Sequence, residues 1–347
     1  MKISAPPTPN LIIANQTIIF HSSEEMDEVA TESVDVIITS PPYNRKKHYS
    51  SDQNEHYNDA QTKEEYFHFL DRVWRECYRV ISPQGIFFLN VGDAAHDQGL
   101  SEEVVRIAEK VGWTRIQDII WLKTIYGKGH YTPSGSSKRF NNIFEHIYLL
   151  VKNENQYKLD PKQIGIPYAD KSNIGRYGEE DLRDPGNVWH IWYDQTTGAT
   201  VKKGHDAPFP IGLPYMCLKV VPQARLVLDP FLGTGTTLAA AHALGIRGIG
   251  YEKFPRKELI EKTVQSGLNY ISPSPILIPH YELTIQLLLS WLAHNSNFTI
   301  PTPSSKKAYL ELQIMYDTLM KMKPSTKFAG KFIEELEKCL RNFKKLA

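Results

Sequence analysis

The sequence has few features that would mark a specialised class of protein. Its 347 residues contain only three cysteines, Cys77, Cys217 and Cys339. These lie far apart and form neither a Cys-X-X-Cys pair nor a zinc-ligand spacing, so we expect reduced thiols in a cytoplasmic protein. The net charge of +1 gives no global polyanion signal. Any nucleic-acid surface must therefore be a local patch.

Long uninterrupted apolar runs are also missing. The most apolar long stretch, Ile276 to Leu292, is broken by Pro279, His280 and further polar residues, and is too short and polar to span a membrane. The first twenty residues lack the basic start and long apolar core of a signal peptide. The length allows one large α/β domain plus an appendage.

The chain is organised around Leu228 to Thr237, which reads Leu-Asp-Pro-Phe-Leu-Gly-Thr-Gly-Thr-Thr. The apolar segment Leu226 to Leu228 predicts a buried strand, and the Ala-rich segment Leu238 to Leu244 predicts a helix. Gly233 and Gly235 have no Cβ, so the backbone between these elements can adopt unusual dihedrals and a ligand can approach it closely. The start of the helix presents unpaired N–H groups.

A second apolar run, Gly248 to Tyr251, follows this helix and ends in Glu252. Doubly wound sheets bind adenosine with this order of strand, glycine turn, helix and strand, and the acid contacts the ribose hydroxyls. The motif lacks the lysine of a P-loop and the third glycine of a dinucleotide fingerprint, which argues against a nucleotide polyphosphate. The alternative is a glycine turn that only lets a helix pack on a sheet.

The second informative motif is Thr39-Ser40-Pro41-Pro42-Tyr43-Asn44, after the predicted buried strand Val34 to Ile38. Two prolines cannot continue a strand ladder. They fix φ and remove two N–H donors, which leaves a stiff turn with outward carbonyls. Together with the Ser40 hydroxyl and the Tyr43 ring, the turn offers acceptors beside an aromatic face, as an exocyclic nucleobase amine requires. An ordinary Pro-Pro turn is the alternative.

Both motifs resemble those of one family. Asp229 to Thr237 closely resembles the S-adenosylmethionine (SAM) loop of amino-methylating DNA methyltransferases. Thr39 to Asn44 resembles the catalytic motif of the N4-cytosine and N6-adenine enzymes. The catalytic motif precedes the SAM loop, which is the permuted order called the β class. That order also separates the chain from glutamine methyltransferases with a similar turn. The resemblance covers roughly Leu11 to Leu268.

The resemblance implies the Rossmann-like fold of SAM-dependent methyltransferases, an α/β fold with a mixed, mostly parallel seven-stranded sheet and helices on both faces. We divide the chain into a catalytic half (residues 1–151), a target-recognition region (152–200) and a SAM-binding half (201–270). Residues 271–347 show helical spacing between prolines, which predicts a C-terminal helical extension outside the resemblance.

The implied reaction is methyl transfer from SAM to the exocyclic amine of a base flipped out of double-stranded DNA, without a metal. The Ser40 hydroxyl and the Pro41 carbonyl would accept hydrogen bonds from the amine. Pro42 would stiffen the turn, and Tyr43 would stack on the base. The implied cofactor-binding residues are Asp229, Phe231, Gly233, Gly235, Thr236, Thr237, Glu252, His205, Pro208 and Phe209.

Serine at position 40 is typical of cytosine-N4 enzymes, whereas Asp or Asn is typical of adenine-N6 enzymes, so we favour cytosine N4. The alternatives are an N6-adenine enzyme, a non-catalytic SAM- or DNA-binding regulator that has kept the fold, and a methyltransferase acting on RNA. By analogy with the family, partners would include a second copy of the chain and a restriction endonuclease acting at the same site.

Periodicity predicts the remaining elements. We expect a small hairpin within Leu11 to Phe20 and a short helix over Glu24 to Ala30. Thr62 should cap a helix with Glu65 in a capping box. Ser101 should cap a further helix that ends at Gly112.

Overall fold

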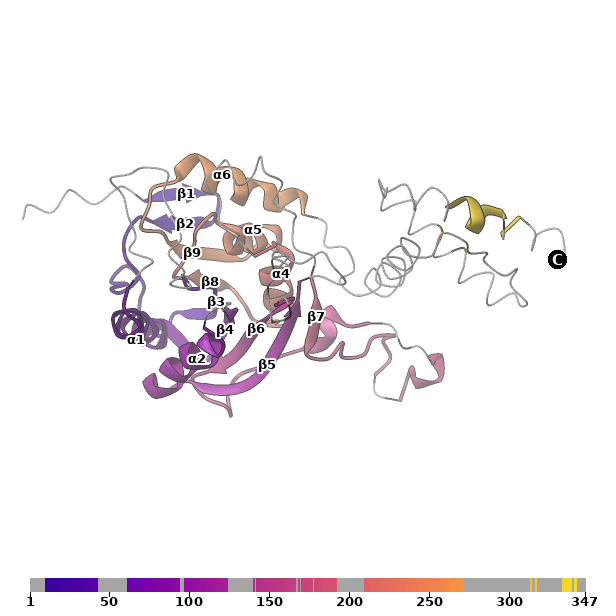
Figure 1. Cartoon of the computed structure of the whole chain (residues 1–347), viewed down its shortest axis with the longest axis horizontal. Helices are drawn as coiled ribbons and strands as arrows, with labels where there is room; N and C mark the ends of the chain where they lie inside the picture. The colour runs from indigo at the N-terminus through magenta and orange to yellow at the C-terminus, as the bar shows by residue number, and fades with distance from the viewer. Residues whose placement is uncertain are drawn as a thin grey trace, which may run out of the picture. The chain divides into compact units, whose positions relative to one another are not determined.

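The computed structural model describes residues 10–42, 61–93, 97–123, 140, 142–166, 168, 170–176, 178–191, 209–270, 313, 316, 333–338 and 340–341. The chain divides into two compact units. The first contains Met1–Lys123 and Asn142–Ser272, and the second contains Thr124–Asn141 and Pro273–Ala347. The first unit carries the sheet and both sequence motifs (Figure 1).

A mixed sheet runs through the first unit and, in the described ranges, has nine strands in the order β1-β2-β9-β8-β3-β4-β6-β5-β7 (Figure 1). The strands β2, β9, β8, β3 and β4 pair in parallel, and β6 runs antiparallel to β4 and β5. The bounds are β1 Leu11–Ile13, β2 Gln16–Ile19, β3 Val34–Thr39, β4 Ile81–Val91, β5 Thr114–Leu122, β6 Phe144–Val151, β7 Val188–His190, β8 Leu226–Asp229 and β9 Arg247–Tyr251.

The mixed, mostly parallel sheet and the hairpin within Leu11 to Phe20 are confirmed. The expected count of seven strands is wrong, because two strands of only three residues extend the sheet at its edges. β1 joins through the hairpin, and β7 pairs with β5 from the region predicted to recognise the target. Strands this short bury too few residues to show a period of two.

Helices cover both faces of the sheet, as expected. Alternate residues of β3 face opposite ways: Ile37 packs in a cluster with Trp74, whereas Ile38 packs in a cluster with Met216 and Ala240. The first cluster contains residues of α1 and α2, and the second contains residues of α4 and α5. The bounds are α1 Lys63–Val80, α2 Leu100–Val111, α4 Gly212–Lys219, α5 Thr236–Ala243 and α6 Lys257–Ser266. Three short 3-10 helices are η1 Pro161–Ile164, η2 Lys171–Asn173 and η3 Gly267–Asn269.

The capping box of α1 is confirmed. Glu65 N donates to Thr62 Oγ1 at 3.2 Å, and Thr62 N donates to Glu65 Oε2 at 2.9 Å. The predicted cap at Ser101 is wrong: Gly99 is the N-cap of α2, and the Ser101 hydroxyl donates to Asp93 Oδ1 at 2.7 Å. Ser101 therefore lies within the first turn of α2, where Asp93 Oδ1 also accepts from its backbone N–H at 3.0 Å.

The predicted helix over Glu24 to Ala30 is also wrong, since the segment forms turns. Val29 N donates to the Met26 carbonyl at 2.9 Å within the segment, and further backbone groups bond to side chains of α1. Met26 N donates to Glu76 Oε2 at 2.9 Å, and Arg79 donates to the carbonyls of Met26 and Val29 at 2.9 and 3.1 Å. These tertiary bonds replace the bonds of a helix.

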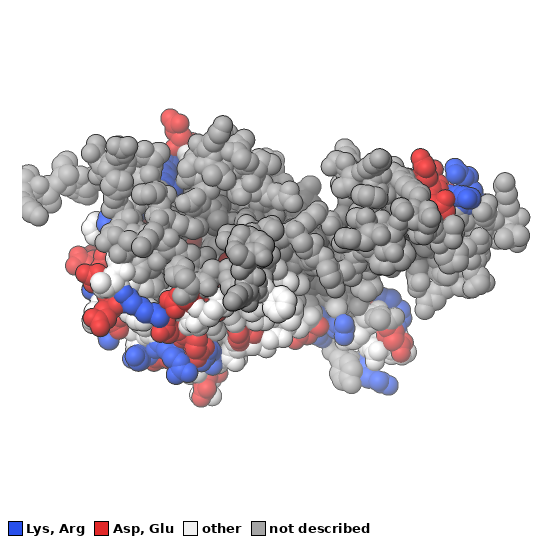
Figure 2. Space-filling view, in the orientation of Figure 1, with Lys and Arg blue, Asp and Glu red and all other residues white. Residues whose placement is uncertain are grey.

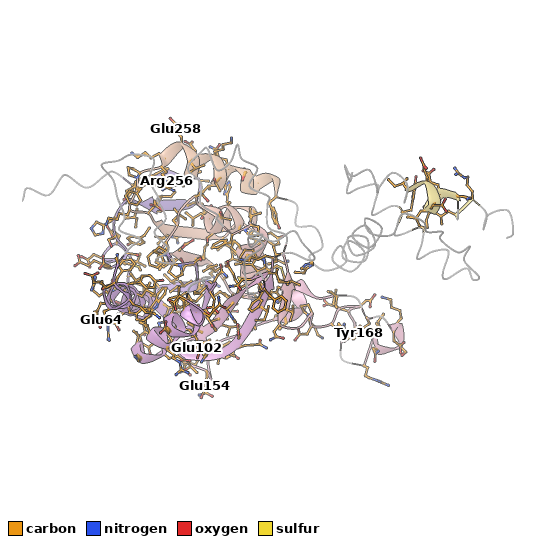
Figure 3. All side chains as sticks on the ribbon, viewed as in Figure 1. Glu64, Glu102, Glu154, Tyr168, Arg256 and Glu258 are labelled. Atoms are coloured by element: carbon orange, nitrogen blue, oxygen red, sulfur yellow. The ribbon has the colours of Figure 1, made fainter. Side chains whose placement is uncertain are left out.

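Figure 2 shows Lys and Arg side chains mixed with Asp and Glu over the region of α1 and α2. Arg75 pairs with Asp71 at 2.8 Å, and Glu102 (labelled in Figure 3) pairs with Arg106 at 3.2 Å and with Arg115 at 2.8 Å. Exposed pairs of this kind contribute at most about 1 kcal/mol each. The mixed signs do not form the basic patch that DNA binding requires.

In the second unit, Glu334 to Lys338 lie in a helical stretch, Leu336 is buried, and the Tyr316 hydroxyl donates to Glu337 Oε1 at 2.8 Å. The other helices expected after residue 270 lie outside the described ranges, and the division of the chain into four segments stays a prediction. Among the helices that the structure describes, none has the length and apolarity to cross a bilayer.

Candidate active site

The two sequence motifs lie at neighbouring strand ends. β3 ends at Thr39 directly before the Pro-Pro turn, β8 ends at Asp229 directly before the glycine turn, and β9 ends directly before Glu252. β3, β8 and β9 are adjacent and parallel. Their carboxyl ends therefore meet at one edge of the sheet, where open α/β sheets bind ligands.

The glycine turn requires its glycines. Gly233 and Gly235 have φ of 57° and 93°, in the left-handed region, and Gly235 is the N-cap of α5. A Cβ on Gly235 would lie 3.3 Å from side-chain atoms of Ile260 and Val264, so α6 packs closely against this position. Among the described residues, a Cβ on Gly233 would meet only the Phe231 carbonyl, at 3.9 Å. The described part of the chain therefore leaves space beside Gly233 for a ligand.

Asp229 is a buried residue whose carboxylate accepts hydrogen bonds from three segments near these turns. Its side chain is 1% exposed. Thr39 Oγ1 donates to Oδ1 and Thr237 Oγ1 donates to Oδ2, each at 2.6 Å, and Phe231 N donates to Oδ1 at 3.0 Å. Burial raises the pKa of Asp229 to about 6, against the opposing effect of these donors. The carboxylate thus joins β3, the glycine turn and the start of α5.

Glu252 is half-buried beside the same turn. Phe254 N donates to Glu252 Oε1 at 2.9 Å. Burial raises the pKa of Glu252 to about 7, although the N–H groups of Phe254 and Gly233 and the charge of Arg256 favour the ionised form. Arg256, labelled in Figure 3, is the N-cap of α6. A carboxylate in this position can accept hydrogen bonds from hydroxyl groups of a ligand.

The two described aromatic residues that were predicted to bind the cofactor, Phe231 and Phe209, pack against the hydrophobic core. The Phe231 ring lies 5.7 Å from that of Phe69 and 6.0 Å from that of Trp74, both on α1. Phe209 is half-buried and packs against the cluster formed with α4 and α5. The adjacent hydroxyl residues at the start of α5, Thr236 and Thr237, are both buried.

In the Pro-Pro turn, Pro41 is buried, and Ser40 and Pro42 are half-buried. Tyr43, His205 and Pro208 lie outside the described ranges. Thr39 was given no role by the sequence motif, yet its hydroxyl makes the hydrogen bond that joins β3 to the Asp229 side chain. The one sequence feature that could have drawn attention to Thr39 is that it is the first residue of the motif.

A mixed sheet with helices on both faces, a glycine turn after one central strand and an acid after the next define a Rossmann-like SAM-dependent methyltransferase. The model of the N6/N4 methyltransferase family, described as DNA methylase, matches residues 34–262. The chain belongs to this family of DNA methyltransferases, which act on DNA.

The chain is similar to the Type II methyltransferase M.MjaI of Methanocaldococcus jannaschii, with 29% identity over 278 residues that cover 70% of this chain and 88% of that protein. It is also 29% identical over 280 residues to M.MthZI of Methanothermobacter thermautotrophicus, covering 72% and 77% of the two chains. The solved structure of the PvuII DNA methyltransferase (cytosine-N4-specific) has 20% identity and a TM-score of 0.53, covering 74% and 93%. That likeness shows the fold alone.

The cofactor of the family is SAM. The residues present fit it: there is open space beside Gly233, N–H groups at the start of α5 face the same edge, and Glu252 supplies a carboxylate. SAM carries a net positive charge, which suits the carboxylate of Glu252, whereas both oxygens of the buried Asp229 are hydrogen-bonded to Thr39, Phe231 and Thr237. The roles of the individual residues remain predictions.

Proposed function

We propose that the protein is a site-specific DNA methyltransferase that modifies N4 of cytosine in a flipped base, as the modification enzyme of a restriction–modification system. The observation that supports this most is the placing of the turn at Ser40 beside the glycine turn, with the hydrogen bond between Thr39 and Asp229 joining the two strand ends. The two relatives named Type II methyltransferases support the biological role.

When bound, SAM supplies a methyl group activated by a sulfonium. The Ser40 hydroxyl oxygen and the Pro41 carbonyl oxygen accept hydrogen bonds from the two N–H groups of the target amine. The lone pair of the amine nitrogen is then directed at the methyl carbon. Pro42 keeps the turn stiff, and Tyr43 stacks on the flipped base.

In the same proposal, the cofactor lies along the glycine turn. Glu252 accepts hydrogen bonds from the ribose hydroxyls, and Gly233 and Gly235 let the backbone approach the ligand. The remaining residues assigned to the methionine end are Asp229, Phe231, Thr236, Thr237, His205, Pro208 and Phe209.

The choice of base is tested by incubating the protein with SAM labelled in its methyl group and duplex DNA, and then separating the digested nucleosides. We expect the label in N4-methylcytosine, because Ser40 offers a neutral acceptor rather than a carboxylate. Label in N6-methyladenine alone would overturn the choice of cytosine. SAM binding without transfer would favour a regulator, and preferential labelling of RNA in competition with duplex DNA would favour an RNA enzyme.

Glu252→Gln should weaken SAM binding at pH 8 about tenfold or more and reduce its pH dependence. Because burial raises the pKa of Glu252 to about 7, the wild-type carboxyl is mostly protonated at pH 6 and mostly ionised at pH 8. If the ionised form binds the ribose, the Kd for SAM falls about tenfold over that range. Calorimetric titration of both proteins at several pH values measures this.

Glu258→Gln is the matched control, since Glu258 is an exposed acid at the start of α6, labelled in Figure 3. It should keep both the affinity and the pH dependence of the wild type. A Glu252→Gln protein that binds SAM as tightly as the wild type at pH 8 would show that Glu252 does not bind the ribose.

A further inference from the structure

The backbone ladder between the two central strands that carry the motifs stops before their carboxyl ends. Backbone pairing between β3 and β8 runs only from Val36 with Val227 to Ile37 with Leu228. On their other sides the same strands stay paired to their ends: Thr39 pairs with Leu89 of β4, and Asp229 pairs with Gly250 of β9. The ladder is therefore missing between β3 and β8 at the edge where the two turns begin.

A side-chain bridge lies where this ladder stops. Thr39 Oγ1 donates to Asp229 Oδ1 at 2.6 Å, and Thr237 Oγ1 donates to Asp229 Oδ2 at 2.6 Å. Thr39 and Thr237 are fully buried and Asp229 is 1% exposed. Water cannot substitute for these bonds without a rearrangement of the core. The bridge is one residue from Ser40 and four residues from Gly233 along the chain.

We propose that Thr39 and Asp229 are a positioning pair, which sets the separation between the turn that holds the target amine and the turn that holds the methyl donor. The proposal rests on the proposed function. Methyl transfer needs the attacking nitrogen and the methyl carbon about 3–3.5 Å apart and aligned, and a misplacement of about 1 Å can reduce the rate about 100-fold. Since the backbone ladder does not hold β3 to β8 at this edge, the side-chain bond does.

The chemistry of the bridge supports a role beyond packing. Burial of the Asp229 carboxyl disfavours its ionised form, so the carboxylate is a costly way to fill this space. Two apolar side chains could fill the core here without that cost. They would not fix a distance, whereas a hydroxyl–carboxylate bond has a narrow range of lengths.

The test is Thr39→Val, which keeps the shape of the side chain and removes the hydroxyl donor, compared with Thr39→Ser, which keeps the donor. We measure the single-turnover rate of methyl transfer at saturating SAM and DNA, the Kd for SAM and the Tm. The valine variant should transfer methyl about 10- to 100-fold more slowly with a Kd for SAM within about threefold of the wild type. The serine variant should restore the rate to within about threefold.

Val36→Ala provides a control for lost stability, because Val36 is fully buried on the same strand and makes no part of the bridge. It should lower the Tm and leave the single-turnover rate of the folded protein unchanged. Equal rates for Thr39→Val and the wild type, or equal losses in the valine and serine variants, would overturn the positioning role. A wild-type protein that transfers no methyl group would overturn the proposed function itself, which separates the two failures.

Discussion

Ser40→Ala should reduce the single-turnover rate of methyl transfer about 100- to 1,000-fold while the Kd for SAM stays within about threefold of the wild type. The half-buried Ser40 directly follows β3, beside the glycine turn, and in the proposed mechanism its hydroxyl accepts a hydrogen of the target amine only in the reacting complex. Loss of one such positioned group costs about this much in other enzymes. Quenched-flow transfer from labelled SAM to duplex DNA measures the rate.

Ser33→Ala is the matched control at the opposite end of β3. Ser33 is exposed, and its hydroxyl donates to the Ala30 carbonyl at 2.6 Å, away from the carboxyl edge. This variant should transfer methyl at the wild-type rate. If Ser40→Ala were as fast as Ser33→Ala, the Ser40 hydroxyl would have no part in catalysis.

Gly233→Leu should weaken SAM binding by about 100-fold or more in a protein that still folds. Among the described residues, a Cβ at Gly233 meets only the Phe231 carbonyl, at 3.9 Å, so the first carbon of the new side chain meets no close contact there. That space is where the proposed cofactor lies. A loss of 100-fold corresponds to about 2.8 kcal/mol of binding free energy. Calorimetric titration measures the affinity, and the Tm reports on folding.

Gly245→Leu controls for backbone strain. Gly245 follows α5 with φ of 70°, and a Cβ there would meet none of the described atoms within 4 Å. Both variants place leucine in the left-handed region at a similar conformational cost of about 1 kcal/mol. Gly245→Leu should bind SAM like the wild type. Equal SAM affinity in Gly233→Leu and Gly245→Leu would place the cofactor elsewhere.

Long buried elements of the fold could be predicted from the sequence. The β-branched run that forms β3 and the apolar runs of β8 and β9 are short continuous apolar segments, and each is followed by a motif with its own chemistry. The resemblance to the methyltransferase family implied that these strand ends are neighbours in the sheet. The pairing of β3 with β8, and of β8 with β9, bears this out.

The two local predictions that were wrong, a helix and a helix cap, concern segments whose hydrogen bonds go to other parts of the structure. Glu24 to Ala30 has helical spacing, but Glu76 and Arg79 of α1 take its backbone bonds. The hydroxyl of Ser101 bonds to Asp93 and does not cap α2. Local propensity cannot anticipate such tertiary competition.

The candidate site was found in outline, and one element of it was missed. The motif from Thr39 to Asn44 drew attention to Ser40 and the prolines, because their chemistry can be understood locally. The role that we propose for Thr39 depends on a carboxylate 190 residues away, at Asp229. A single sequence contains no signal for that pairing, since neither residue type at its position demands the other.

The central claim is that the turn at Ser40 and the turn at Gly233 form two walls of one pocket that brings a methyl carbon to an amino nitrogen. A crystal structure of the protein with SAM bound tests this most directly. The account predicts the ribose within hydrogen-bond distance of Glu252 and the methyl group directed at the space beside Ser40 and Pro41. SAM bound away from these two turns, or bound with its methyl group directed away from Ser40, would contradict it.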